Sequence, residues 1–408
     1  MPIKYTARDL IRELAKVTIF SLAKIVPKQK NLWVFGAWKG GKYSDNSKYL
    51  FEYVSRNHPE IDVLWVTNNK LAHALVKQSG GKVAYFGSLR ATWACMRAGV
   101  AITCVDAAHD LPSYTISAKT RRVQLWHGLG PKAYHLAKMS QRDLEAVGQM
   151  DIVSKIINKL VLLYAYLLTW RWYNGINWLP YNLMPSQDLV VTTSALGQQK
   201  MTQVFGGLAK QIEILGYPRH DHLMSGGHKQ SGKSKRIKVL YAPTHRTESQ
   251  GTGIKQVEEL SEALKKYPQI ELLVKLHDLA KDKVENVQLL SEGDIAQDIC
   301  TLLPQIDVLI TDYSSIYTDF LLLDRPIVFT PFDLADYRDN DQGFFMDYDT
   351  VTPGPKAKSW EEAIQLAATS EEWSKKYEGE RKRTLALFHE VRDGKSSERI
   401  VKRIKSIS

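Results

Sequence analysis

Short apolar runs rich in Val, Ile, Leu and aromatic residues recur along the chain, and helical patterns of apolar positions separate most of them. Continuous runs of this length are typical of strands buried on both faces of a parallel sheet, whose crossovers are helices. Seven runs precede residue 225 and five follow residue 236. The pattern predicts an α/β protein with doubly wound sheets. The expected strands lie in NLWVFGAW, DVLWVTN, KVAYFGS, VAITCV, RRVQLWHG, DLVVTTS, IEILGYP, IKVLYAPTHR, IELLVKLH, VQLL, DVLITDYSS and RPIVFTPFD.

A polar stretch, SGGHKQSGKSKR, separates the two groups of strands. It is rich in Gly, Ser and Lys and has no apolar periodicity, which indicates a linker. With 408 residues and 44% hydrophobic content, the chain is long enough for two full cores. We therefore expect two Rossmann-type domains that face a central cleft. The expected division is an amphipathic N-terminal helix in residues 1–28, a first domain at 29–225, the linker at 226–236, and a second domain with terminal helices at 237–408.

Two segments have the composition of an element that lies on a membrane. Residues 9–26 space apolar side chains with a helical period and carry Arg12, Lys16 and Lys24, as basic amphipathic helices at lipid interfaces do. Residues 151–184, in the first domain, are dense in Leu, Tyr and Trp, but the longest uncharged stretch, 160–170, is shorter than the roughly 20 residues that span a bilayer. We expect peripheral attachment through both segments, with the aromatic rings at headgroup level. Packing within the protein is the alternative for each.

Composition narrows the possible partners. Lys and Arg outnumber Asp and Glu by 55 to 44, so the surface should attract phosphates, nucleic acid or an anionic membrane. The three cysteines lie far apart without ligand spacing, which argues against a zinc site and a disulfide framework. The sequence contains no G-x-G-x-x-G or P-loop signature, which disfavours a simple dinucleotide enzyme. We expect neither a metal nor a cofactor.

Polar and basic residues directly follow several of the expected strands, where ligands bind in open parallel sheets. His127 follows VQLW, and Gly128 and Gly130 should leave space for a substrate beside it. A histidine titrates near neutral pH and can take a proton from an incoming hydroxyl, although a structural histidine is the alternative. A set of cations and hydroxyls without a carboxylate pair suits a diphosphate leaving group. The further candidates are Lys132, Arg219, Thr244, Arg246 and Lys275 for substrate binding, and His277 as a second catalytic residue beside His127.

The segment VLITDYSSIYTDFLLLDRPIVF, residues 308–329, predicts a strand, a polar turn, a helix and a second strand. A helix that starts at the end of a parallel strand offers free N–H groups to an anion. We expect Asp312, Ser314, Ser315 and Asp319 to contribute to substrate binding there. The alternative is that Ser314 or Ser315 only caps the helix.

Six segments together resemble, in order, the motifs of the CDP-glycerol:glycerophosphate glycerophosphotransferase family, bacterial enzymes of teichoic acid and capsule synthesis. They are WHGLGPK, LYAPTHR, LLVKLHD, DVLITDYSSIYTDFLLLDRPIVF, FDLADYRDNDQGFFMDYDTVTPGP and FHEVRDGKSSERI. The resemblance implies a GT-B-like fold, CDP-glycerol bound mainly in the C-terminal domain, and a place at the cytoplasmic face of the cell membrane. It places His127 at the general-base position, and Arg246, His277, Ser314 and Ser315 at the donor diphosphate. His245 and Asp278 depart from the family's usual Trp and Pro, which puts the shape of their loops in question.

The resemblance is greatest to the shorter priming enzymes. We therefore expect a peripheral membrane enzyme that moves glycerol phosphate from CDP-glycerol to an undecaprenyl-diphosphate-linked disaccharide and releases CMP. One alternative is a polymerase that adds glycerol phosphate or ribitol phosphate repeatedly. A sugar-nucleotide glycosyltransferase could share the fold. A non-catalytic protein that binds nucleic acid or membrane would leave the histidines at strand ends unexplained, and we expect no nucleic-acid partner.

Overall fold

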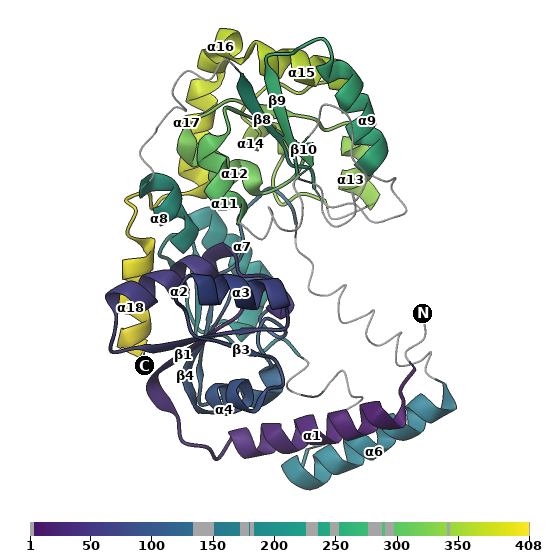
Figure 1. Cartoon of the computed structure of the whole chain (residues 1–408), viewed down its shortest axis with the longest axis vertical. Helices are drawn as coiled ribbons and strands as arrows, with labels where there is room; N and C mark the ends of the chain where they lie inside the picture. The colour runs from purple at the N-terminus through teal and green to yellow at the C-terminus, as the bar shows by residue number, and fades with distance from the viewer. Residues whose placement is uncertain are drawn as a thin grey trace.

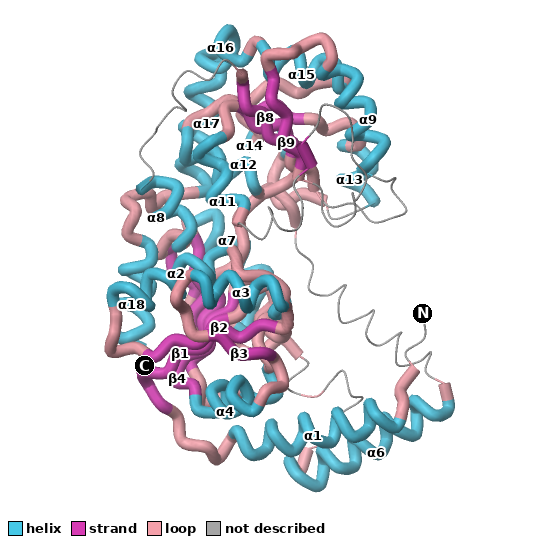
Figure 2. The backbone as a smooth tube through the Cα atoms, in the orientation of Figure 1, coloured by secondary structure: helices cyan, strands magenta, loops and turns pink. Residues whose placement is uncertain are grey.

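The computed structural model describes residues 4–133, 151–171, 179, 183–225, 236–244, 253–275, 288–289, 298–340 and 343–407. The strands within these ranges form two sheets, one in each half of the chain, and every pairing between neighbouring strands is parallel (Figures 1 and 2). Ten of the twelve lie inside the apolar runs that predicted them, and β1 and β4 each begin two residues before theirs. The α/β class and the two doubly wound sheets are confirmed.

The first sheet has the strand order β3-β2-β1-β4-β5-β6-β7. Strands β2 and β3 are added on one side of β1 and the later strands on the other, as in Rossmann folds. Alternate side chains of β1 enter different cores: Trp33 and Phe35 pack with helices α2 and α3, whereas Val34 packs with α4 on the opposite face. This explains the continuous apolar run, since both faces are covered. The strands are β1 Gln29–Phe35, β2 Asp62–Thr67, β3 Val83–Tyr85, β4 Ala98–Thr103, β5 Arg121–Gln124, β6 Leu189–Thr192 and β7 Ile212–Ile214. The helices are α2 Asp45–Asn57, α3 Lys70–Gln78, α4 Leu89–Arg97, α7 Ala195–Phe205 and α8 Pro218–Ser225.

The second sheet repeats the same order on a smaller scale, β10-β9-β8-β11-β12. Its β11 leads directly into the short helix α12, as the polar turn predicted. The strands are β8 Ile237–Tyr241, β9 Ile270–Val274, β10 Gln288–Leu289, β11 Val308–Thr311 and β12 Ile327–Phe329. The helices are α9 Gly253–Leu264, α11 Ile299–Leu302, α12 Ile316–Phe320, α13 Leu334–Asn340, α14 Tyr348–Val351, α15 Trp360–Ala368, α16 Ser370–Trp373 and α17 Glu378–Phe388.

The last helix, α18 (Ser396–Ile407), returns to the first domain (Figure 1). Its Ile400, Val401 and Ile404 are buried in the core of the first sheet. The carboxylate of Asp221 accepts hydrogen bonds from the first N–H groups of this helix, at 2.8 and 2.7 Å. The expected boundary at 237–408 therefore requires a correction, because an amphipathic pattern does not reveal which core a helix covers. The expected linker falls almost wholly outside the described residues.

The N-terminal helix α1 (Ala7–Ala23) lies beside α6 (Ile152–Thr169), apart from the sheets (Figure 1). The helices share a core formed by Val17, Ile157, Val161 and Ala165. Among the described residues, α6 is the one helix whose length and composition, 18 residues with a mean hydropathy of 1.5, would allow it to cross a membrane. The uncharged stretch at 160–170 had indicated a segment that is too short. Length and composition alone do not separate a spanning helix from one that packs.

Candidate functional site

His127 lies just beyond β5, at the carboxyl edge of the first sheet. The preceding residue, Trp126, has a φ of 57°, and the imidazole packs against the rings of Trp126 and Trp38 at centroid distances of 4.7 and 6.2 Å. Burial lowers the pKa of His127 to about 4, and Arg219 and two nearby lysines act in the same direction. His127 is therefore neutral at neutral pH and able to accept a proton.

Strained backbone is concentrated around this histidine. Of the six non-glycine residues with positive φ in the described chain, four lie on segments that contact His127 directly or through Arg219. Such conformations cost on the order of 1–3 kcal/mol each and cluster at functional sites. They point to this region without any reference to sequence motifs. The four residues are Trp38, Lys39, Asp45 and Trp126.

Ser315 of the second domain packs directly against the histidine loop. A Cβ atom on Gly128, whose φ is 142°, would lie 3.0 Å from the Ser315 Oγ, and one on Gly130 would lie 2.8 Å from its Cβ. The two glycines therefore admit Ser315, whereas we had expected them to leave open space for a substrate. Ser315 is the residue before α12, but its side chain makes no capping hydrogen bond, which contradicts the cap alternative for this serine. Ser314 is half-buried beside it.

The carboxyl ends of β8 and β11 are joined by Asp312. Its Oδ1 accepts hydrogen bonds from the backbone N–H groups of Thr244, at 2.7 Å, and Tyr313, at 2.5 Å. Asp312 thus shapes the turn, and its contact with substrate stays a prediction. Within the described chain, the buried Oγ1 of Thr244 has no hydrogen-bond partner. A buried hydroxyl in that state is a candidate for a ligand contact.

Two predicted basic residues lie close to this region. Lys132 pairs with Phe344 through a short antiparallel bridge and lies 6.0 Å from the ring centroid of Tyr337. Lys275 follows β9, and burial lowers its pKa. Their contacts with substrate stay predictions. Arg246 and His277 lie outside the described residues, as do His245 and Asp278.

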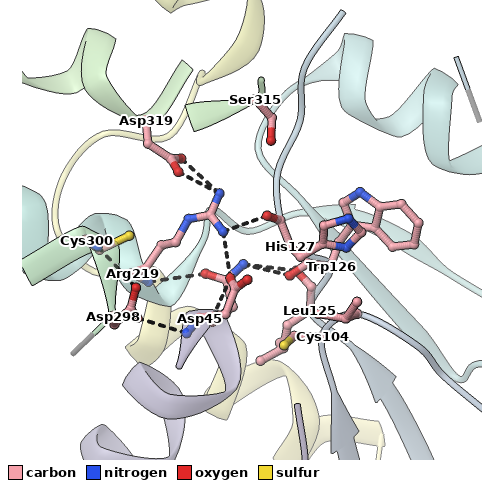
Figure 3. Close-up of polar contacts among 12 residues, drawn as sticks. Asp45, Cys104, Leu125, Trp126, His127, Arg219, Asp298, Cys300, Ser315 and Asp319 are labelled. Carbon is pink, nitrogen blue, oxygen red and sulfur yellow. Dashed lines mark hydrogen bonds and ion pairs between the residues drawn. The ribbon is translucent and has the colours of Figure 1, made fainter. Parts of the chain in front are cut away.

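Arg219 and Asp319 form a buried ion pair with each other (Figure 3). The Arg219 Nη2 lies 2.9 Å from Asp319 Oδ2, and its Nη1 lies 2.6 Å from Asp45 Oδ1 and donates to the His127 carbonyl at 2.8 Å. Although burial opposes the charge, Asp319 and Asp45 hold the pKa of Arg219 well above its ordinary value. Both residues were predicted to bind substrate. The structure pairs them within the protein, and that prediction stays untested.

Asp319 also belongs to a cluster with two histidines that the sequence did not reveal. Asp319 Oδ1 lies 2.8 Å from His220 Nε2, and ligand atoms of His220, Asp319 and His389 all lie within 4.8 Å of one another. This is the one group among the described residues with the composition of a metal site. Both Asp319 oxygens already have partners, and Arg219 balances its charge. The arrangement therefore fits an ion-pair network better than a cation site.

Sequence reasoning also missed Asp45, Asn46, Thr318 and Lys200, which contact the histidine loop or Arg219. Asp45 and Asn46 stand in FGAWKGGKYSDNS, a stretch that follows β1 and carries several polar residues. Burial raises the pKa of Asp45 to about 6, against the opposite effect of Arg219. The polar residues of this stretch, which directly follow a strand, could have identified Asp45 and Asn46 from the sequence.

The sequence of this chain matches one protein family and several characterised relatives. Residues 18–168 and 181–406 match the family described as CDP-Glycerol:Poly(glycerophosphate) glycerophosphotransferase. A teichoic acid glycerol-phosphate transferase of Staphylococcus aureus (strain NCTC 8325 / PS 47) is 25% identical over 422 residues, which cover 97% of this chain and 99% of that protein. A teichoic acid poly(glycerol phosphate) polymerase of Bacillus subtilis (strain 168) is also 25% identical, over 89% of this chain. The alignment covers 49% of that polymerase, so this chain spans about half its length.

The fold has a solved counterpart. The structure of the wall teichoic acid polymerase TagF superposes with a TM-score of 0.71 at 19% identity, covering 98% of this chain and 94% of that one. At this identity the likeness concerns the fold alone. Together with the two parallel sheets, it confirms the predicted GT-B-like architecture.

Proposed function

Because the chain belongs to the CDP-glycerol:poly(glycerophosphate) glycerophosphotransferase family, we propose that it transfers glycerol phosphate from CDP-glycerol to a hydroxyl of an undecaprenyl-diphosphate-linked disaccharide. The observation that carries this proposal is the neutral, half-buried His127 at the junction of the two domains, on a loop whose glycines pack against Ser315. A single addition is favoured over polymerisation because the S. aureus transferase matches along nearly its whole length. A polymerase remains the second candidate, since the B. subtilis polymerase matches over 89% of this chain.

The reaction assigns a defined role to each group. The acceptor oxygen attacks the β-phosphorus of CDP-glycerol, the bond from that phosphorus to the bridging oxygen breaks, and CMP leaves with the electron pair. His127 accepts the proton of the acceptor hydroxyl. Lys132 and Lys275, with Arg246 and His277, provide positive charge for the phosphoryl oxygens.

The low pKa of His127 is compatible with this role. Part of the lowering comes from the positive charges of Arg219, Lys132 and Lys200. A bound diphosphate brings negative charge among these cations and thereby raises the proton affinity of the imidazole. The histidine is then a better base when the donor is bound. In the free enzyme, its low pKa keeps it unprotonated.

Attachment to the cytoplasmic face of the cell membrane is part of the proposal. One side of α6 packs on α1, yet its opposite side is also apolar, with Ile152 77% and Leu167 62% exposed and Trp170 just beyond the helix 82% exposed. Exposed apolar stripes of this kind mark contact surfaces. A spanning orientation would carry the ion pairs of Arg12 and Lys16 on α1 into lipid, so we propose that both helices lie along the surface.

The test is mass spectrometry of a lipid-linked disaccharide incubated with the enzyme and CDP-glycerol. We expect one added glycerol phosphate and a stoichiometric amount of CMP. A ladder of products would identify a polymerase. If CDP-ribitol or a sugar nucleotide competes successfully against CDP-glycerol, the proposed donor is wrong. If the enzyme binds CDP-glycerol without forming any of these products, the proposal is wrong.

A further inference from the structure

The loop that carries His127 is held from outside by side chains that are remote in the sequence. Four of its carbonyl groups accept hydrogen bonds from four different helices, two in contact with the first sheet, one between the domains and one in the second domain. The donors are Asn46 Nδ2 to Trp126 (2.8 Å), Arg219 Nη1 to His127 (2.8 Å), Thr318 Oγ1 to Leu129 (2.8 Å) and Lys200 Nζ to Gly130 (2.5 Å). The position of the loop therefore depends on tertiary contacts more than on its own sequence.

Arg219 differs from the other three donors because it also connects the loop to both domains. One guanidinium nitrogen bonds to Asp45 at the start of α2, and the other bonds to Asp319 in α12. Asp319 is further held by His220, and the backbone N–H of Asp45 donates to Asp298 of the second domain at 2.9 Å. A planar guanidinium with several fixed acceptors allows little freedom of orientation.

Stability is a poor explanation for such a network. Buried ion pairs are frequently no more stabilising than apolar side chains of the same volume, because desolvation offsets the attraction. Arg219 is 4% exposed and makes its contacts at the point where Figure 3 shows His127, Asp45 and Asp319 converging. The geometry of the loop is what these contacts specify.

We propose that Arg219 is a positioning residue, which fixes the backbone of His127 and couples it to the second domain through Asp319. This inference rests on the proposed role of His127 as the general base. The guanidinium already has three acceptors, and a diphosphate would have to displace a buried carboxylate to reach it. Loss of Arg219 should therefore affect turnover more than donor binding.

The test compares Arg219→Gln and Arg219→Lys with Arg381→Gln in the full-length protein. Arg381 is a matched control, since it is equally buried, with an Asp324 ion pair at 2.8 Å and a carbonyl contact, all within the second domain. We expect Arg219→Gln to lower kcat about 100-fold, the scale of a misplaced catalytic group, with the donor KM within about threefold. Arg219→Lys keeps the positive charge but lacks the planar guanidinium that bonds to three acceptors at once, so kcat should also fall. Arg381→Gln should reduce stability alone.

An NMR titration of the His127 imidazole gives a readout that does not depend on the reaction. Removing the guanidinium should raise the pKa of His127, whereas Arg219→Lys and Arg381→Gln should leave it near its parental value. If the protein shows no transfer activity and the pKa of His127 still rises in Arg219→Gln, the proposed function fails, but the interaction between Arg219 and His127 stands.

Three results would overturn the proposal. The first is parental turnover in folded Arg219→Gln, and the second is a raised donor KM with unchanged kcat, which would make Arg219 a donor ligand. If Arg219→Gln does not fold, Asp319→Asn decides, because it removes the charge and one of the two oxygens that hold the guanidinium while leaving Arg219 and the side-chain volume in place. Parental turnover in that variant is the third contrary result.

Discussion

At the residue scale, His127 is the most sharply testable position. His127→Ala should fold normally, bind CDP-glycerol within about twofold of the parent, and lose roughly 100-fold or more in kcat, the usual scale for a proton transfer. Because the base must be unprotonated and its pKa in the free enzyme is lowered to about 4, kcat/KM should persist as the pH falls through 6.5 and decline towards 4, whereas kcat, which reports the donor complex, should decline at a higher pH. Steady-state kinetics and calorimetry measure these effects. His109→Ala is the control, since that histidine is exposed and pairs only locally with Asp106. Near-parental turnover of His127→Ala on saturating acceptor would place the base elsewhere.

Gly130 offers a second test at this scale. In Gly130→Ala the new methyl group would meet the Ser315 Cβ at 2.8 Å, so the second domain or the histidine loop must shift. Overpacking of this kind costs typically 1–3 kcal/mol, and we expect lower activity together with a lower free energy of unfolding in urea. Gly207→Ala is the matched control, because no atom lies within 4 Å of its added Cβ. Equal behaviour of the two variants would show that the contact between the domains is loose.

At the scale of elements, the outward stripe of α6 should determine membrane binding. Replacing Leu163 and Leu167 by Glu should reduce sedimentation with anionic vesicles several-fold, because it removes apolar burial and adds repulsion. Leu387→Glu, on α17 of the second domain, changes an exposed leucine away from this surface and should have no effect. Arg12 and Lys16 already pair with Asp9 and Glu13, so high salt should release only part of the protein. Unchanged vesicle binding of the folded double variant would refute the attachment surface.

At the scale of the whole molecule, acid should destabilise the protein before most carboxylates titrate. Burial lowers the pKa values of His127, His220 and His389, so the unfolded chain binds more protons than the folded one below about pH 6.5. Stability is then lost as the pH falls, by up to about 1.4 kcal/mol per pH unit for each histidine. Asp45, with its pKa raised to about 6, acts in the opposite direction. Urea unfolding at about pH 7 and about pH 5 measures the slope, which His389→Gln should reduce. An unchanged slope in that variant contradicts the assignment.

Local patterns predicted the fold well because most connections between consecutive strands of the two sheets are short, the passage from β5 to β6 through α6 being the long exception. The apolar runs identified each strand, and the polar residues after them pointed to His127 and Ser315, whose segments pack together in the structure. The ion pairs of Arg219 with Asp45 and Asp319 join positions 174 and 100 residues apart, and no local periodicity encodes such partners. For the same reason, the sequence could not show that α18 covers the first core or that Ser315 fills the space beside two glycines.

The return of α18 to the first domain has a consequence for protein synthesis. A ribosome that has released residues up to 225 has produced every strand of the first sheet, but not Ile400, Val401 or Ile404, which complete its core. Multidomain chains commonly finish their N-terminal domain first during translation. Here the second domain is the first unit that can close, and the first domain keeps an open apolar surface until the final helix emerges. That interval is when the nascent chain is most exposed to aggregation and most dependent on chaperones.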